Sequence, residues 1–249
     1  MNFFVSLHAE LFCESMCMKQ SRAYFVGYIL LFLAMVVALL LVPKGELHLG
    51  LNGYHTPFLD GLMQTVTYFA QWPLYVIALL LFCKRYCMLA YYAMSEAAAA
   101  IVVQTIKHIF NMPRPLAFFG DDPAFQQIMV EGVRMHNWHS FPSGHTQTFF
   151  VFFTVFVLLL PALLKSIGHR PTINCSPSNN QSAIGRQSIA AIAALLLAAL
   201  GGYSRIYLSQ HFLLDVCVGS FLGVVVPLLL LPVYNRMAAK WGNKGFLTH

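Results

Sequence analysis

The chain has 249 residues, of which 58% are hydrophobic and only 10% are charged, and its formal net charge is +6. Soluble domains carry about 25% charged residues, so this composition excludes an ordinary soluble domain and predicts an all-α, polytopic integral membrane protein. Nucleic acid is not an expected partner, because the sequence has no basic stripe with interleaved aromatic residues.

The first segment, residues 1–22, is expected to be cytoplasmic or to lie at the membrane interface. It contains Glu10 and Glu14 and has no early basic region followed by a long apolar core, so it does not resemble a cleaved signal. Its apolar residues could form an amphipathic interfacial helix. A frayed tail is one alternative, and a later start of the protein, at Met16 or Met18, is another.

Six apolar runs follow, each long enough for a membrane-spanning helix of about 20 residues. Because irregular backbone cannot face lipid, they are expected to form a bundle of six transmembrane helices. Pro73 predicts a kink in the second helix, and Gly219 and Gly223 predict close packing of the sixth helix within the bundle. In chain order the runs are Tyr24–Val42, Leu62–Phe82, Met88–Phe110, Gly144–Leu164, Ser188–Leu208 and Phe212–Val233.

Two long connections separate these helices. The stretch from Asn111 to Ser140 is expected to begin irregularly, because of its Pro and Gly residues, and to contain a short helix around Ala124–Met129. Loops of this length are usually functional. The polar stretch from Ser166 to Gln187 is expected to be a flexible linker, and residues 236–249 a cytoplasmic tail. No two cysteines have CxxC spacing, so free thiols are expected rather than a disulfide framework.

The distribution of Lys and Arg predicts that both termini are cytoplasmic, because basic residues are enriched in cytoplasmic loops. Under this orientation ten of them lie in cytoplasmic segments and five lie in outer segments. The cytoplasmic set is Lys19, Arg22, Lys84, Arg85, Lys165, Arg170, Arg186, Arg236, Lys240 and Lys244; the outer set is Lys44, Lys107, Arg114, Arg134 and Arg205.

Polar residues gather at the outer ends of helices three to six, where they have the chemistry of an anion site. Lys107, Arg114 and Arg205 offer fixed positive charge, and an Arg can bind two oxygens of a phosphate at once. Ser143 and Gly144 open the fourth helix, whose exposed backbone N–H groups and dipole favour a bound anion. These five residues are therefore predicted to bind a phosphate group.

Two histidines lie in different sequence environments. His211 and Asp215 are four residues apart and share one helix face, so the carboxylate can orient the ring and stabilise charge that develops on it. His145 has no such partner and follows the glycine of the anion site, where it could donate a proton to a leaving oxygen. The pattern suits one nucleophile and one general acid, although it does not decide which histidine attacks.

The three groups of residues together resemble the signature of the type 2 phosphatidic acid phosphatase (PAP2) family, which also includes vanadium haloperoxidases and bacterial membrane lipid phosphatases. The matching segments are Lys107-x6-Arg114-Pro115, Pro142-Ser143-Gly144-His145 and Ser204-Arg205-x5-His211-x3-Asp215. They occur in the expected order within 107–215. The phosphatase domain is accordingly expected to span residues 23–235.

The resemblance implies a metal-independent phosphatase without cofactors, acting at the outer face of a bacterial inner membrane. By the family pattern, His211 forms a phosphohistidine, Asp215 supports it, and His145 protonates the leaving group. The implied substrate is a lipid phosphate from the bilayer, and three classes stay open. These are an isoprenoid pyrophosphate such as undecaprenyl pyrophosphate, a glycerophospholipid phosphate such as phosphatidic acid or phosphatidylglycerol phosphate, and the phosphates of lipid A.

Two other functions fit the same pattern less well. A vanadate-dependent, haloperoxidase-like oxidase would use the same anion pocket, but that branch resembles soluble proteins. A non-enzymatic lipid binder or transporter would not need His145, His211 and Asp215 together.

Four further residues are left without a firm assignment, as is the oligomeric state. Glu96 lies within the third helix, where a structural hydrogen-bonding role is favoured over a lipid-headgroup contact or a proton path. Arg134 could contact a second phosphate or a sugar. His136 and His139 have HxxH spacing but lack a nearby third ligand, so a place at the pocket rim is favoured over a metal site.

Overall fold

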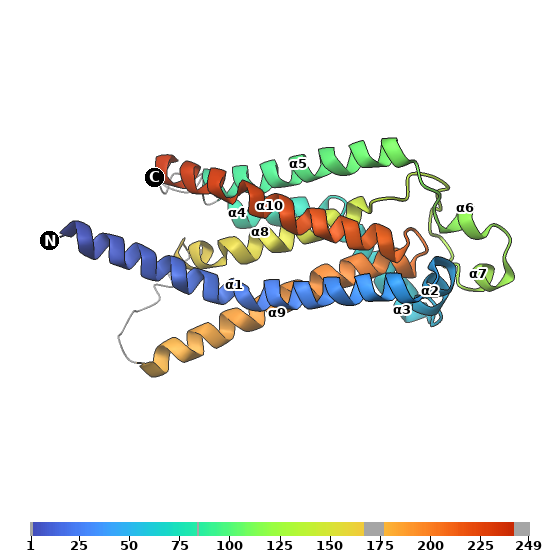
Figure 1. Ribbon diagram of the computed structural model, residues 1–249, viewed down its shortest axis with the longest axis horizontal. Coiled ribbons are helices and arrows are strands. Elements are labelled where there is room, and N and C mark those ends of the chain that lie inside the picture. Colours follow the sequence, from blue (N-terminus) through green and yellow to red (C-terminus); the bar gives the residue numbers. More distant parts are fainter. Residues whose placement is uncertain (1, 84, 167–176, 242–249) are drawn as a thin grey trace.

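The computed structural model describes residues 2–83, 85–166 and 177–241, which form ten helices and, within those ranges, no strand. Figure 1 shows the long helices running alongside one another as a bundle. The helices are α1 (Asn2–Leu41), α2 (Lys44–Leu51), α3 (Pro57–Phe69), α4 (Pro73–Phe82), α5 (Tyr86–Phe110), α6 (Pro115–Phe119), α7 (Pro123–Gln127), α8 (Gly144–Ser166), α9 (Pro177–Tyr207) and α10 (Leu213–Trp241).

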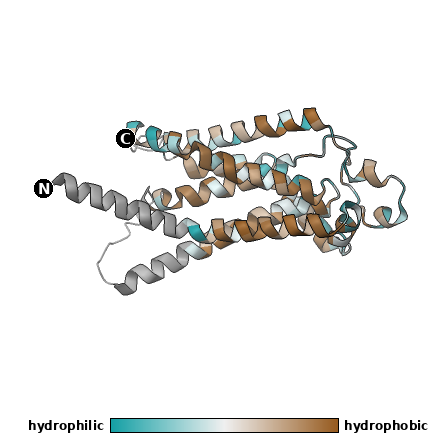
Figure 2. Ribbon diagram, viewed as in Figure 1, coloured by the Kyte–Doolittle hydropathy of each residue, from teal (hydrophilic) through white to brown (hydrophobic). Residues whose placement is uncertain are grey.

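The predicted membrane architecture is confirmed. Within the described ranges, five helices are long and apolar enough to cross a membrane, and the bent pair α3–α4 makes a sixth span if it is counted as one. Large apolar side chains on these helices are exposed, including Leu30 at 63% and Leu229 at 71%. Soluble monomers do not expose continuous apolar surfaces of this extent, whereas a lipid-facing surface requires them. Figure 2 shows the hydrophobic residues along the length of the bundle.

The second span is broken rather than merely kinked. Helix α3 ends at Phe69, α4 begins at Pro73, and the two axes differ by 52°. Pro73 occupies the first turn of α4, where its missing N–H costs no hydrogen bond. The chain therefore changes direction where the kink was predicted, but Pro73 begins a separate helix instead of bending one continuous helix.

Other segments depart from expectation at their ends. Helices α2 and α6 were not predicted, and α6 corrects the expectation that the stretch from Asn111 begins irregularly; α7 overlaps the short helix expected around Ala124–Met129. The linker predicted between Ser166 and Gln187 is wrong for its second half, because α9 already begins at Pro177; residues 167–176 lie outside the described residues. Helix α1 continues through positions 22–23, and α10 continues through positions 235–236. The division of the chain into residues 1–22, 23–235 and 236–249 therefore stays a prediction.

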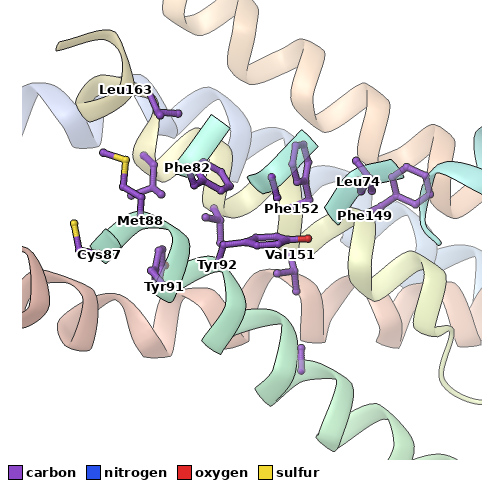
Figure 3. Packing of buried hydrophobic residues seen from close by; sticks show 14 of the residues in the cluster. Leu74, Phe82, Cys87, Met88, Tyr91, Tyr92, Phe149, Val151, Phe152 and Leu163 are labelled. Carbon is purple, nitrogen blue, oxygen red and sulfur yellow. The ribbon is translucent and has the colours of Figure 1, made fainter. Parts of the chain in front are cut away.

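The core of the bundle is built around α8, which packs against α5, α9 and α10. Figure 3 shows Phe149 and Phe152 of α8 among the buried side chains near Leu74 of α4. The predicted packing role of the two glycines is confirmed, because a Cβ at Gly219 would lie 2.5 Å from the carbonyl oxygen of Ser143 and one at Gly223 would lie 2.7 Å from that of Gln147. These glycines let α10 approach the first turn of α8 closely.

The two ends of the bundle differ in what they carry. Helix α1 begins and α10 ends at one end, whereas α2, α6 and α7 lie at the opposite end (Figure 1). The start of α8 and the ends of α5 and α9 also lie toward α2, α6 and α7. Among the cysteines with described side chains, Cys83, Cys87 and Cys217 are free thiols, as expected.

Candidate active site

The end of the bundle that carries α2, α6 and α7 contains a cavity of about 680 Å³. It brings together six of the eight predicted site residues from α5, the loop after it, α8, α9 and the turn before α10. Those six are Lys107, Arg114, Gly144, His145, Arg205 and His211. The other two, Ser143 and Asp215, are fully or almost fully buried and are not among the residues that line the cavity.

His211 is held by the first turn of α10. Its Nδ1 lies 3.3 Å from Oδ2 of Asp215, and the same oxygen accepts hydrogen bonds from the Ser140 hydroxyl and, at 2.9 Å, from the Phe212 backbone N–H. Only 1% of His211 is exposed. Burial and then the charges of Arg114, Arg205 and Lys107 lower the pKa of His211 well below its ordinary value. The ring is therefore neutral at physiological pH, and Nδ1 is turned to the carboxylate, which leaves Nε2 as the nitrogen available for chemistry.

The first turn of α8 is hydrogen-bonded to the first turn of α10, which carries the Asp215 carboxylate. The Ser143 N–H donates to the Asp215 carbonyl oxygen at 2.9 Å, and the Ser143 hydroxyl accepts from the Thr146 hydroxyl at 2.9 Å. Both polar groups of Ser143 thus have protein partners. The predicted contact between its side chain and a phosphate stays a prediction, and Gly144 and His145 are the residues of this turn that line the cavity.

Lys107 and Arg114 are fixed by backbone carbonyls of the loop that precedes α8. Lys107 Nζ donates to the His139 carbonyl at 3.1 Å, and Arg114 Nε donates to the Trp138 carbonyl at 3.0 Å. His139 Nδ1 in turn lies 3.3 Å from the Lys107 carbonyl oxygen. His139 therefore joins the loop to the end of α5, and it is not among the described residues that line the cavity.

Arg205 approaches the cavity from α9 and is 7% exposed. One terminal nitrogen donates to the Thr67 hydroxyl of α3 at 2.6 Å, whereas its buried Nε has no hydrogen-bond partner among the described residues. A buried guanidinium N–H without a partner is costly. Because Arg205 lines the cavity, a bound anion would supply the missing acceptor.

Helix α2 supports the turn that carries His211, which the sequence did not reveal. Asn52, at its end, donates to the Ser209 hydroxyl at 2.8 Å and to the Ile206 carbonyl at 3.1 Å. His48 Nε2 lies 3.3 Å from the same hydroxyl, and burial lowers the pKa of His48 to about 4, so this ring is also neutral. Ser209 has a φ of +49°, a left-handed conformation that these contacts hold in place.

The cavity is strongly electropositive. Arg134 and His136 line it in addition to the predicted residues, and none of its described lining residues is an Asp or a Glu. Burial together with the charges of Arg114, Arg134, Arg205 and Lys107 lowers the pKa of His136. The described residues contain no group of three or more His, Cys, Asp or Glu side chains arranged to hold a metal ion. The arrangement is suited to binding a multiply charged oxyanion next to a neutral histidine.

Sequence reasoning missed four supporting residues. Ser140 lies directly before the Phe141-Pro142-Ser143 segment, and Gln210 lies directly before His211, so proximity to a motif was a usable signal. The Gln210 carboxamide oxygen accepts from Arg114 at 3.1 Å. Thr67 and Asn52 are distant in sequence from every motif, and only the fold brings them to the site.

Comparisons with known proteins agree with this geometry. The model of the PAP2 superfamily matches residues 88–238. LpxE from Aquifex aeolicus is 25% identical in its solved structure, covering 75% of this chain and 93% of that one, with a TM-score of 0.52. The first transmembrane PAP2 type phosphatidylglycerolphosphate phosphatase from Bacillus subtilis is 20% identical, covering 85% and 96%, with a TM-score of 0.55. No curated protein matches the sequence.

Proposed function

Because the chain belongs to the PAP2 superfamily, we propose that it is a metal-independent phosphatase that removes phosphate from a membrane lipid at the outer face of the membrane. One observation carries the proposal. A buried, neutral His211, oriented by Asp215, opens onto a cavity whose charged lining residues are all basic. A nucleophile of this kind, beside donors that favour a phosphoryl group, is the arrangement that phosphoryl transfer to a side chain requires.

In the first step, Nε2 of His211 attacks phosphorus and the bond between phosphorus and the lipid oxygen breaks. The imidazole then carries the phosphoryl group and a positive charge, which the carboxylate of Asp215 stabilises through Nδ1. His145 donates a proton to the lipid oxygen as it leaves. Lys107, Arg114 and Arg205, together with the start of α8, hold the phosphoryl oxygens throughout.

In the second step, water attacks the phosphohistidine. His145, now without its proton, accepts one from the water, the bond between phosphorus and Nε2 breaks, and inorganic phosphate is released. His145 thus acts as an acid in the first step and as a base in the second, whereas His211 is first the nucleophile and then the leaving group, and water is the only reactant besides the lipid.

The substrate is proposed to be a lipid phosphomonoester or pyrophosphate. A cavity of about 680 Å³ has room for more than one phosphate, and the basic Arg134 lies on its wall beside the predicted phosphate ligands. The solved Bacillus subtilis relative is a phosphatidylglycerolphosphate phosphatase, which supports keeping that lipid beside phosphatidic acid, undecaprenyl pyrophosphate and lipid A among the substrates to test.

The outer location is supported by the charge distribution together with the fold. The end of the bundle that carries the cavity lies away from the start of α1 and the end of α10. More Lys and Arg residues fall in the segments assigned to the opposite end than in those near the cavity, which supports a cytoplasmic location for that end; the cavity would then face the periplasm of a bacterial inner membrane.

The test is phosphate release by the purified protein in excess EDTA. Its panel contains phosphatidic acid, phosphatidylglycerol phosphate, undecaprenyl pyrophosphate and lipid A, and His211→Ala is the control. We expect release from at least one lipid, lost in the variant. An absence of release from all four by a folded preparation, or equal release by His211→Ala, would overturn the proposal.

A further inference from the structure

A second cavity, of about 540 Å³, lies within the membrane-spanning part of the bundle. It is lined by α3, α4, α8 and α9, and every described residue of the lining is apolar. Its volume falls in the roughly 300–1,000 Å³ range of small-molecule sites. We call it the α4–α9 groove, because those two helices form its sides and α8 forms its floor.

The groove follows from the break in the second span. Helix α3 packs on α9, but after the 52° bend at residues 70–72 helix α4 packs on α8 and α5 instead. Helix α9 contributes small side chains where it faces the gap, namely Ala190, Ala193 and Ala194. At the end of the groove that these three alanines line, the side chains of α9 are too small to fill the space beside α4, whereas Leu197 and Leu200 line the other end.

One end of the groove adjoins the phosphate site. Val66 lines the groove, and its neighbour Thr67 lines the electropositive cavity and accepts the hydrogen bond from Arg205. From Leu200 to Ala190 the α9 residues of the lining span ten positions, or about 15 Å of helix. The groove thus begins beside the phosphate site and extends past the midpoint of the α9 span, Ser188–Tyr207, toward the opposite end of the bundle.

The side of the groove is accessible along α9 and α3. Leu197 is 50% exposed and Phe69 is 40% exposed although both line the groove. In a membrane this exposed surface faces lipid, so a hydrocarbon chain can enter sideways. An all-apolar cavity excludes water and peptide groups, which would lose their hydrogen bonds there, and it favours hydrocarbon.

We propose that the α4–α9 groove binds one hydrocarbon chain of the lipid whose phosphate occupies the electropositive cavity. This inference rests on the proposed function and extends it, because it names the part of the substrate that is recognised inside the membrane. Binding of the chain in the α4–α9 groove makes the enzyme selective for amphiphiles with a long chain, since the phosphate site alone would accept any small phosphate ester.

The first test changes the groove without touching the phosphate site. Ala193 lines the groove and is exposed there, so Ala193→Phe fills the groove without entering the packed core. Ala34 is an exposed residue of α1, a helix that contributes nothing to the lining, so Ala34→Phe is the matched control. The probes are dioleoyl phosphatidic acid in bicelles and the soluble dibutyryl phosphatidic acid.

We expect Ala193→Phe to lower kcat/KM for the dioleoyl lipid by about tenfold or more, because the chain loses its apolar contacts, and to leave the dibutyryl ester unchanged. Ala34→Phe should change neither value. An equal effect of Ala193→Phe on both substrates, or no effect on either, would overturn the inference. A wild-type protein that hydrolyses neither ester would instead count against phosphatidic acid as a substrate.

A second test does not depend on turnover. His211→Ala is incubated with phosphatidic acid that carries a photoreactive diazirine in its acyl chain, and the labelled peptides are identified by mass spectrometry. We expect labels on groove residues of α8 and α9, such as Phe153, Phe156 and Leu197, and their loss in a variant that also carries Ala193→Phe. Labels spread evenly over the lipid-facing helices would overturn the inference.

Discussion

At the scale of single residues, Asp215 is the point where three parts of the site meet. Its carboxylate contacts His211, the Ser140 hydroxyl and the Phe212 N–H, and its carbonyl accepts from Ser143. The side chain is 2% exposed and does not line the cavity. Its contribution to the proposed reaction is therefore to orient the imidazole and to stabilise the charge that forms on it.

Replacement of Asp215 by Asn should lower kcat by about 10²–10⁴-fold with a smaller change in KM, because an amide keeps the shape but not the charge. The measurement is steady-state phosphate release, together with rapid-quench detection of the phosphohistidine. Ser140→Ala removes one hydrogen bond to the carboxylate and should lower kcat about tenfold. An Asp215→Asn variant with unchanged kcat would contradict the role given to the carboxylate.

The sequence singled out several residues that line the electropositive cavity, because their residue types are unusual at membrane depth. Charged and ionisable side chains are costly in an apolar helix bundle, so they indicate a functional site. The residues of this kind are Lys107, Arg114, Arg205 and His211. Asn52, Thr67 and Ser140 gave no such signal, since uncharged polar residues are common near helix ends. Only tertiary contacts identify Asn52 and Thr67 as supports of the site, whereas Ser140 could have been suspected from its place beside a motif.

At the scale of elements, Glu96 joins three helices inside the bundle. This α5 carboxylate accepts hydrogen bonds from Tyr75 of α4 at 3.2 Å, from Gln147 at 3.1 Å and from Thr148 at 2.7 Å, the last two on α8. The structural role favoured for Glu96 stays a prediction, but these three donors give it a physical basis. Gln147 lies two residues after His145, so the contact also fixes the first turns of α8.

Glu96→Ala should lower the melting temperature by several degrees, because it leaves three donors without an acceptor at about 1–3 kcal/mol each. Differential scanning fluorimetry in detergent provides the measurement. Ser95→Ala is the matched control, since the Ser95 hydroxyl is buried and has no partner among the described residues, and it should change the melting temperature little. Equal effects of the two variants would show that the network has no special importance.

Helix α2 has a comparable function at the end of the bundle that carries the electropositive cavity. Asn52→Ala removes the donors to Ser209 and Ile206 and should lower kcat about tenfold, because the turn before His211 is then free to leave its left-handed conformation. The variant is compared by phosphate release with Glu46→Ala, an exposed change on the same helix. If both variants keep wild-type kcat, α2 does not position the histidine.

The elements that the sequence predicted well are those determined by length and hydropathy. Five spans follow from runs of about 20 apolar residues, which can satisfy their backbone in lipid only as helices. The break before Pro73 and the helix α2 depend on packing against α8, α9 and the 208–212 turn, which hydropathy does not report. The apolar groove is a consequence of that break, so hydropathy did not predict the groove either.

At the scale of the whole molecule, the proposed outer-face reaction depends on the orientation of the bundle. The electropositive cavity and the ends of the termini-bearing helices lie at opposite ends, so a single determination of topology decides on which side the phosphate is released. Two exposed positions report on the two ends: Glu131, in the loop before α8, and Lys240, near the end of α10.

In a background with all six cysteines replaced by serine, Glu131→Cys and Lys240→Cys are each treated in spheroplasts with a membrane-impermeant maleimide. We expect Glu131→Cys to react directly and Lys240→Cys to react only after the membrane is permeabilised, because the basic end should stay in the cytoplasm. Retained phosphatase activity shows that each variant is folded. The reverse pattern would place the cavity in the cytoplasm, where the substrate would have to come from the inner leaflet. The proposed periplasmic reaction would then be wrong, even if the chemistry proposed for His211 were right.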